Sequence, residues 1–303
     1  MPQTSHLRFL DPKVLSSIAS IELKARLLVQ GMWASRHRSP YYGQSVEFVD
    51  HREYSPGDEP KIIDWKTYAR TDRYMVKRFE MESHMNVAIL LDASGSMAYV
   101  PQSRSRIGKL EYASYMAAGL SYLALHQQDA AGLITFDTGI RDFLPPRQTK
   151  QHLMAILARL DGIRPGGETG LRPVCERLAQ RLPRRGMIIL ISDCYDDADA
   201  VVDGFKILMT RGHEVIVFQL LDHDELEWPF DKLSNFRDME TGHMVRGDPA
   251  ALREGYLANL RAFLGRIEEG AKSCGMTYTL VDTAEPIERT LQHYLLRRLH
   301  MFR

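Results

Sequence analysis

An acidic residue and two hydroxyls are spaced two residues apart in the segment Asp92-Ala-Ser94-Gly-Ser96. This segment directly follows Val87-Ala-Ile-Leu-Leu91, an apolar run typical of a strand that is buried on both faces of a sheet. Open α/β sheets bind their ligands at the carboxyl ends of parallel strands, where such a loop lies. Mg2+ prefers oxygen ligands and is held by only a few protein oxygens, so two hydroxyls with nearby carboxylates suit it. The sequence therefore predicts a divalent-cation site in this loop.

Two further loops are expected at the same edge of the sheet. Thr169 stands in Gly166-Gly-Glu-Thr-Gly170, ahead of a predicted helix, and Asp193 follows Ser192 at the end of another apolar run. Together with the first loop they complete a set of five residues. This set resembles, position by position, the metal-ion-dependent adhesion site of von Willebrand factor type A domains: Asp92, Ser94, Ser96, Thr169 and Asp193.

The resemblance implies a role for each of the five residues. Ser94, Ser96 and Thr169 are implied as direct or near-direct ligands of Mg2+, with Mn2+ or Ca2+ as alternatives. Asp92 and Asp193 are implied to hold metal-bound waters, and one coordination position is left for an acidic residue of a partner. A single serine or threonine in such a loop is more often a turn residue or a helix cap, but the complete set in this order favours the metal site.

A second group of acids, Asp196, Asp197 and Asp199, follows the last of these loops. A second metal site is one interpretation of it. Acidic residues are favoured in the first turn of a helix, where they meet its dipole. We therefore expect these acids to cap a helix that begins near Ala200.

Short apolar runs alternate with stretches of helical period from residue 86 onward, which predicts a domain over residues 86–303. The predicted fold class is α/β with a doubly wound, mostly parallel sheet, and the resemblance implies that it is of von Willebrand factor type A (Rossmann-like) type. A hairpin around Gly242 is expected as an excursion from the sheet, and a helix over 286–299 closes the chain. The predicted strands are Val87–Leu91, Gly132–Phe136, Met187–Ile191, Val215–Phe218 and Tyr278–Asp282, and the helical stretches cover 107–124, 153–160 and 257–271.

Residues 1–85 differ and are predicted to form a smaller N-terminal α+β segment packed on the sheet domain. An amphipathic helix begins after Asp11-Pro12, and half-exposed strands are expected near 46–48 and 74–79. Pro56-Gly57-Asp58 predicts a turn. Asp64, Trp65 and Arg70 are expected to lock this segment onto the sheet domain; the alternative is a docking surface for an acidic partner.

The segment 45–82, joined to the Asp92–Met97 loop, is similar to the uncharacterised bacterial family of von Willebrand factor type A proteins that accompanies MoxR-type AAA+ ATPases. The stretches Asp238-Met-Glu-Thr-Gly242 and Tyr294-Leu-Leu-Arg-Arg298 also match that family. Many of its members carry transmembrane helices before this region, whereas here only the amphipathic helix is expected. The resemblance implies partnership with an ATPase and gives no reaction.

Composition narrows the classes of partner. Lys plus Arg and Asp plus Glu both number 39 among 303 residues, which argues against nucleic acid or an anionic membrane as the default partner. Cys175, Cys194 and Cys274 are odd in number and far apart, so neither a disulfide framework nor a zinc site is indicated. The sequence shows neither a signal peptide nor an apolar run of roughly 18 residues, and a cytoplasmic protein without a membrane span is expected.

These features favour a metal-dependent protein-binding module over an enzyme. Its expected role is that of a chaperone-like adaptor for a MoxR-type ATPase, or for that ATPase's client, in the assembly or maturation of a protein complex. A metal-dependent phosphohydrolase with Asp92 as nucleophile is one alternative, but it would need a second Asp where Ser94 stands, and the sequence has no P-loop. A scaffold subunit whose metal only braces three loops is the other.

Overall fold

The computed structural model describes residues 46–55, 63–81, 85–101, 106–183 and 185–301. They belong to two compact units, one within residues 33–84 and one that begins at Met85. The predicted N-terminal amphipathic helix and the predicted turn at Pro56-Gly57-Asp58 lie outside the described residues.

The smaller unit is built on a two-stranded antiparallel ribbon. Strand β1 (Val46–Glu53) pairs with β2 (Met75–Met81), which confirms the two strands expected there. A short helix, α2 (Trp65–Thr71), lies between them in the chain. This helix was not predicted, because seven residues are too few for a helical period to be recognised.

Asp64 begins helix α2. Its carboxylate accepts hydrogen bonds from the backbone amides of Lys66 and Thr67, at 3.0 and 3.2 Å, as an N-cap residue does. Trp65 is 57% exposed and packs edge-on against Tyr68. Asp64 therefore caps a helix, and its expected role with Trp65 and Arg70 in locking this segment onto the sheet domain stays a prediction.

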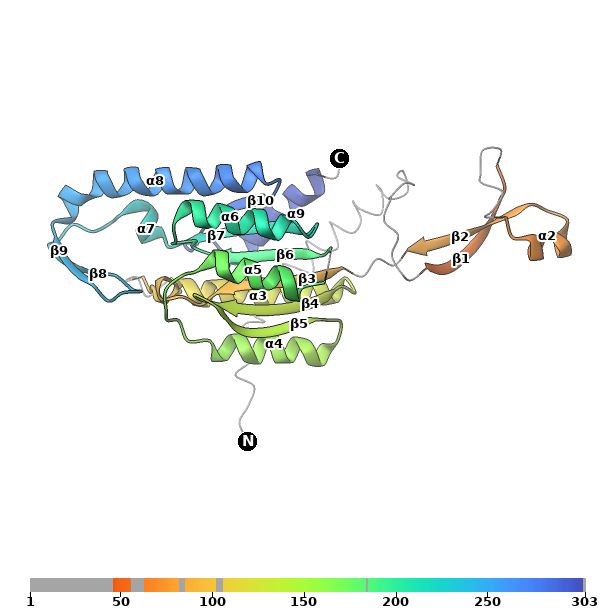
Figure 1. The fold of residues 1–303 in the computed structure, drawn as a ribbon, viewed down its shortest axis with the longest axis horizontal. Helices are drawn as coiled ribbons and strands as arrows, with labels where there is room; N and C mark the ends of the chain where they lie inside the picture. Colours follow the sequence, from red (N-terminus) through yellow and green to blue (C-terminus); the bar gives the residue numbers. More distant parts are fainter. Residues whose placement is uncertain (1–45, 56–62, 82–84, 102–105, 184, 302–303) are drawn as a thin grey trace, which may run out of the picture. The chain divides into compact units, whose positions relative to one another are not determined.

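The larger unit contains a six-stranded sheet (Figure 1). The strand order is β10-β7-β6-β3-β4-β5, and all neighbours are parallel except β4 and β5. This confirms the predicted α/β fold with a mostly parallel sheet, and all five predicted strands are present. The strands are β3 (Asn86–Asp92), β4 (Ala130–Phe136), β5 (Ile140–Arg147), β6 (Met187–Ser192), β7 (Glu214–Leu221) and β10 (Thr277–Asp282).

The antiparallel edge strand β5 was not predicted, because it contains Pro145 and Pro146. Proline cannot donate a backbone hydrogen bond, so within a sheet it is confined largely to edges. The neighbouring strand accommodates it with Gly132, where an added Cβ would lie 2.7 Å from the carbonyl oxygen of Leu144.

Helices cover both faces of this sheet (Figure 1). One face packs against α3, α4 and α9, and the other packs against α5, α6 and α8. The helices are α3 (Lys109–His126), α4 (Lys150–Gly162), α5 (Leu171–Arg181), α6 (Ala198–Met209), the short α7 (His223–Glu227), α8 (Pro249–Ser273) and α9 (Ile287–Met301). In the described residues, none of the helices combines the length and the apolar character that a membrane crossing needs.

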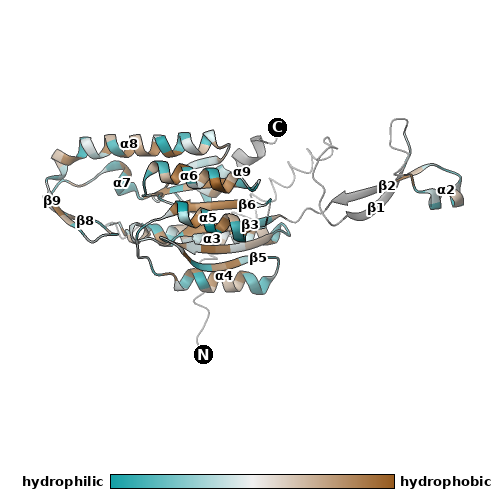
Figure 2. Ribbon diagram, viewed as in Figure 1, coloured by the Kyte–Doolittle hydropathy of each residue, from teal (hydrophilic) through white to brown (hydrophobic). Residues whose placement is uncertain are grey.

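Two apolar cores result from the alternation of side chains along each strand. In β3, Val87, Ile89 and Leu91 belong to the core under α3, whereas Ala88 and Leu90 belong to the core under α5 and α6. Figure 2 shows β3 and β6 as predominantly hydrophobic ribbons, with mixed colours on the surrounding helices. Each fully buried Leu or Ile contributes about 1.5–3 kcal/mol relative to an exposed one, which holds the strand ends, and the loops after them, in place.

The predicted hairpin is confirmed. Strands β8 (Ser234–Arg237) and β9 (Met244–Gly247) pair antiparallel, with Phe236 opposite Val245. Within β8, Phe236 stacks on Trp228, with ring centroids 5.1 Å apart.

Candidate metal centre

The candidate site lies where the order of the sheet reverses. From β3 the chain moves outward to β4 and β5, then returns to β6 on the other side of β3. Strands β3 and β6 are therefore neighbours, with Leu91 opposite Ile191. Asp92 ends β3 and Ser192 ends β6, so two of the three predicted loops leave the same edge side by side. Such a switch point is the usual ligand-binding position in open α/β sheets.

The first loop is organised around the buried carboxylate of Asp92. One of its oxygens accepts the backbone amide of Ser94 at 2.9 Å, and the other accepts the hydroxyl of Ser192 at 2.5 Å. The hydroxyl oxygens of Ser94 and Ser96 lie 3.0 Å apart. A turn closed by its own aspartate therefore presents two hydroxyls beside that aspartate. Sequence reasoning named Ser192 only as the residue before Asp193 and missed its contact with Asp92.

The loop that carries Thr169 is held directly on the first loop. The amide of Gly95 donates to the carbonyl of Gly167 at 2.8 Å, and the amide of Gly166 donates to the carbonyl of Ala93 at 3.0 Å. These two backbone hydrogen bonds join segments more than 70 residues apart. The structure thus brings the loop of Thr169 against the loop of the two serines.

Asp193 is tied to a lysine that sequence reasoning did not identify. The ammonium of Lys109 lies 2.6 Å from one oxygen of Asp193 and 3.2 Å from Glu225. The other oxygen of Asp193 accepts the backbone amide of Tyr195 at 3.2 Å. The available signal was the position of Lys109 one helical turn before Ala113, on the face of α3 that is buried.

The charges of the site are unevenly compensated. Burial and the nearby charge of Asp193 raise the pKa of Asp92 to about 7, although the hydrogen bonds from Ser192 and Ser94 act in the opposite direction. Burial disfavours the charged form of Lys109, but the carboxylates of Asp193 and Glu225 outweigh it and raise the pKa of the lysine. The fold therefore neutralises Asp193 with an internal cation, while Asp92 relies on a hydroxyl and an amide.

The donor set fits a hard divalent cation. Asp92, Ser94, Ser96 and Thr169 offer only carboxylate and hydroxyl oxygens, and the negative charge of Asp92 is the kind that a cation relieves. Asp193 differs from these four, because its carboxylate is already paired with the ammonium of Lys109. Its predicted role of holding a metal-bound water stays a prediction.

Asp197 caps the helix that follows, as predicted, whereas Asp196 contacts the start of a different helix. The carboxylate of Asp197 accepts the amides of Asp199 and Ala200, at 3.1 and 3.0 Å, and begins helix α6 two residues earlier than expected. Asp196 accepts the amide of Leu171, the first residue of α5, at 3.2 Å. Two of the three acids are therefore used at helix starts.

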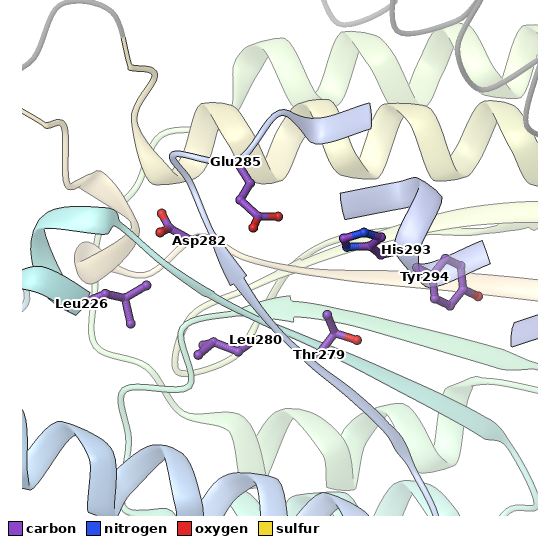
Figure 3. Close-up of a pocket in the computed structure, with 7 residues that line it drawn as sticks. All are labelled: Leu226, Thr279, Leu280, Asp282, Glu285, His293 and Tyr294. Atoms are coloured by element: carbon purple, nitrogen blue, oxygen red, sulfur yellow. The ribbon is translucent and has the colours of Figure 1, made fainter. Parts of the chain in front are cut away.

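A separate cavity of about 230 Å³ lies between β10 and α9 (Figure 3). Figure 3 shows the carboxylates of Asp282 and Glu285 near the end of the strand, and His293 and Tyr294 on the helix. None of the five predicted metal residues lines this cavity, whose walls are Leu226, Thr279, Leu280, Asp282, Glu285, His293 and Tyr294.

Comparison with known proteins identifies relatives in bacteria. A family model described as "Protein of unknown function DUF58" matches residues 50–263. A Mycobacterium tuberculosis protein, Rv1480, described as uncharacterized, is 25% identical over 271 residues, which cover 88% of this chain and 83% of that protein. The Bacillus subtilis protein YeaD, also described as uncharacterized, is 28% identical over 109 residues, 36% of this chain and 24% of that protein.

Two solved structures from Bacteroides are also similar. The conserved hypothetical protein BatB from Bacteroides thetaiotaomicron aligns with a TM-score of 0.47 and 19% identity, over 71% of this chain and 98% of that one. An aerotolerance-related membrane protein from Bacteroides fragilis aligns with a TM-score of 0.46 and 20% identity, over the same shares of 71% and 98%.

Proposed function

The chain belongs to the family described as "Protein of unknown function DUF58", and we propose that it is a metal-dependent protein-binding module with a von Willebrand factor type A fold. Its cation, Mg2+, is held between the three loops at the carboxyl edge of the sheet. Ser94, Ser96 and Thr169 bind it directly, and Asp92 and Asp193 act through metal-bound waters.

The observation that carries this proposal is the state of Asp92. A fully buried carboxylate stands at the switch point of the sheet, beside two hydroxyls, and its pKa is raised to about 7. Burying such a group is costly unless its charge is compensated. A divalent cation would supply that compensation, which explains why a carboxylate is buried at this position.

The partner is a protein that offers an acidic side chain. When bound, the cation supplies a coordination position that a carboxylate can fill. The rim of the site supports a protein ligand, because Val100, four residues after Ser96, is 69% exposed and Met239, whose carbonyl abuts Gly95, is 44% exposed. By the family resemblance, the partner is a MoxR-type AAA+ ATPase or its client, and the chain acts as an adaptor in the assembly or maturation of a complex.

The test of the metal site is a titration with Mg2+, Mn2+ and Ca2+, followed by calorimetry and thermal unfolding. Native protein should bind saturably and unfold at a higher temperature, because a ligand that binds only the folded state stabilises it. Asp92→Ala and Ser94→Ala should lose both effects. Undiminished binding in these two variants would contradict the proposal.

The test of the partner is a pulldown of the MoxR-type ATPase with and without Mg2+. Thr169→Ala should abolish magnesium-dependent capture, whereas Thr210→Ala, at an exposed helix end, should not. If the metal stabilises the chain but capture is independent of it, the chain is a scaffold whose metal braces the three loops.

A further inference from the structure

The tip of the β8–β9 hairpin reaches the candidate metal centre. The carboxylate of Glu240 accepts the hydroxyl of Thr169 at 2.8 Å with one oxygen and the amide of Thr169 at 3.3 Å with the other. These residues are 71 positions apart in the chain. An acidic side chain of the protein itself is therefore bound to one of the residues assigned to the metal.

The first loop is shaped to receive this tip. A Cβ added to Gly95, between the two serines, would lie 2.5 Å from the carbonyl oxygen of Met239 and 3.1 Å from the Cα of Glu240. Only a glycine allows the backbone of the hairpin to come this close. The contact thus involves two of the three metal loops, at Gly95 and at Thr169.

The turn that carries Glu240 is preorganised. The carboxylate of Asp238 accepts the amides of Glu240 and Thr241, at 2.8 and 2.9 Å. The turn closes through a hydrogen bond from the amide of Gly242 to the carbonyl of Asp238 at 3.0 Å, with Gly242 at a φ of 73°. Glu240 is therefore presented by a formed turn and not by a loose loop.

Apart from Phe236, which stacks on Trp228, the hairpin is weakly anchored to the cores. Both strands are short, and Met244 and Val245 are 59% and 52% exposed. Segments with few buried apolar contacts open at low free energy. A partner can therefore lift the tip without unfolding the sheet domain.

The negative charge of Glu240 is best accommodated beside the metal loops when a cation is bound there. Asp193 is paired with Lys109, whereas the buried carboxylate of Asp92 accepts a hydroxyl and an amide, so a cation between the loops would offset the charges of both Asp92 and Glu240. The proposed direct ligands are all hydroxyls, and a hard cation also prefers carboxylate oxygen, which Glu240 can supply.

We propose that Glu240 is an internal ligand of the metal centre, filling the coordination position that an acidic side chain of the partner takes on binding. This inference rests on the proposed metal-dependent function. The hairpin then keeps the site closed in the free protein, and a partner binds by displacing Glu240 with its own carboxylate.

The first experiment compares the Mn2+ affinity of native protein, Glu240→Gln, Thr169→Ala and the exposed control Glu254→Gln, by calorimetry on the full chain. Glu240→Gln should bind about 10- to 100-fold more weakly, the range seen when groups around a metal are removed. Glu254→Gln should bind as the native chain does. Circular dichroism without metal verifies that each variant is folded.

The outcomes separate the two proposals. If Thr169→Ala loses affinity while Glu240→Gln binds like native protein, the metal site stands and the internal ligand is wrong. If Thr169→Ala also binds like native protein, or the native chain binds no metal, the proposed function fails and this inference fails with it.

Two further readouts respond only to a metal-linked role. Free acetate should restore Mn2+ affinity severalfold in Glu240→Ala and leave that of the native chain unchanged. Mg2+ should slow tryptic cleavage at Arg237 and Arg246, which flank the tip, in native protein but not in Glu240→Gln. If Glu240 only supported the Thr169 loop and did not bind metal, cleavage rates would be independent of Mg2+ and acetate would have no effect.

Discussion

The ammonium of Lys109 lies 2.6 Å from the carboxylate of Asp193, and both side chains are fully buried. Glu225, 3.2 Å from the same ammonium, shares this cation. Lys109 is the first residue of α3, and Asp193 follows the last residue of β6. The ion pair therefore joins a helix start to the sheet edge at the point where the three loops of the candidate metal centre meet.

Replacing Lys109 by methionine should lower the free energy of unfolding by about 3–5 kcal/mol, because it leaves two acids buried without their cation. Urea unfolding at pH 7 in the absence of metal measures this. Lys272→Met is the matched control, since Lys272 pairs with Glu268 at 2.7 Å but is 65% exposed, and it should cost less than about 1 kcal/mol. Equal losses of stability in the two variants would show that burial does not increase the contribution of the Lys109 ion pair.

Asp92→Asn should stabilise the metal-free protein at alkaline pH. The pKa of Asp92 is about 7 in the folded protein against 3.8 in the unfolded chain, so the folded state binds more protons between these values. Native stability must therefore fall as pH rises from about 4 to about 7. Asparagine removes this component and should raise the free energy of unfolding at pH 8 by roughly 1–4 kcal/mol.

Urea unfolding in EDTA at pH 5 and pH 8 tests this expectation. The same variant should lose the stabilisation that Mg2+ gives the native chain. An Asp92→Asn protein with the native pH dependence would contradict the assignment of the raised pKa to this carboxylate.

Gly95→Ala should push the hairpin away from the first loop, because the new Cβ would lie 2.5 Å from the carbonyl oxygen of Met239. We expect tryptic cleavage at Arg237 to accelerate severalfold and stability to fall by roughly 1–3 kcal/mol. Gly265→Ala is the control: it lies inside α8 with no atom within 4 Å of its added Cβ. It should stabilise the protein by about 0.5–1 kcal/mol. Unchanged cleavage in Gly95→Ala would mean that the hairpin does not depend on this contact.

Tyr112→Phe should loosen the start of the last helix. The hydroxyl of Tyr112 lies 3.0 Å from the carbonyl of Glu285, to which it donates, and 3.0 Å from the hydroxyl of Thr290, which is left buried without that partner. The expected loss of stability is about 1–2 kcal/mol. Amide hydrogen exchange over residues 287–294 should accelerate more than exchange in β3. Tyr122 lies on α3, as Tyr112 does, and is partly exposed. Tyr122→Phe should therefore change neither the stability nor the exchange rates.

The sequence alone determined the sheet fold and the loops of the candidate site. Strands buried on both faces need unbroken apolar runs, so Val87–Leu91 and Met187–Ile191 were recognisable without any contact being known. The parallel order then requires their carboxyl ends to lie at one edge, which places Asp92 near Asp193. The hairpin around Gly242 was also predictable, because turn residues between short alternating strands are a local signal.

Contacts between distant segments were decided only by the tertiary structure. Lys109 and Asp193 are 84 residues apart, Thr169 and Glu240 are 71 apart, and Asp92 and Ser192 are 100 apart. A lysine in a helix or a glutamate in a turn has no local pattern that names its partner, because that partner is set by how helices and loops pack on the sheet. The compensation of Asp193 by Lys109, and the placement of Glu240 against Thr169, therefore followed from packing alone.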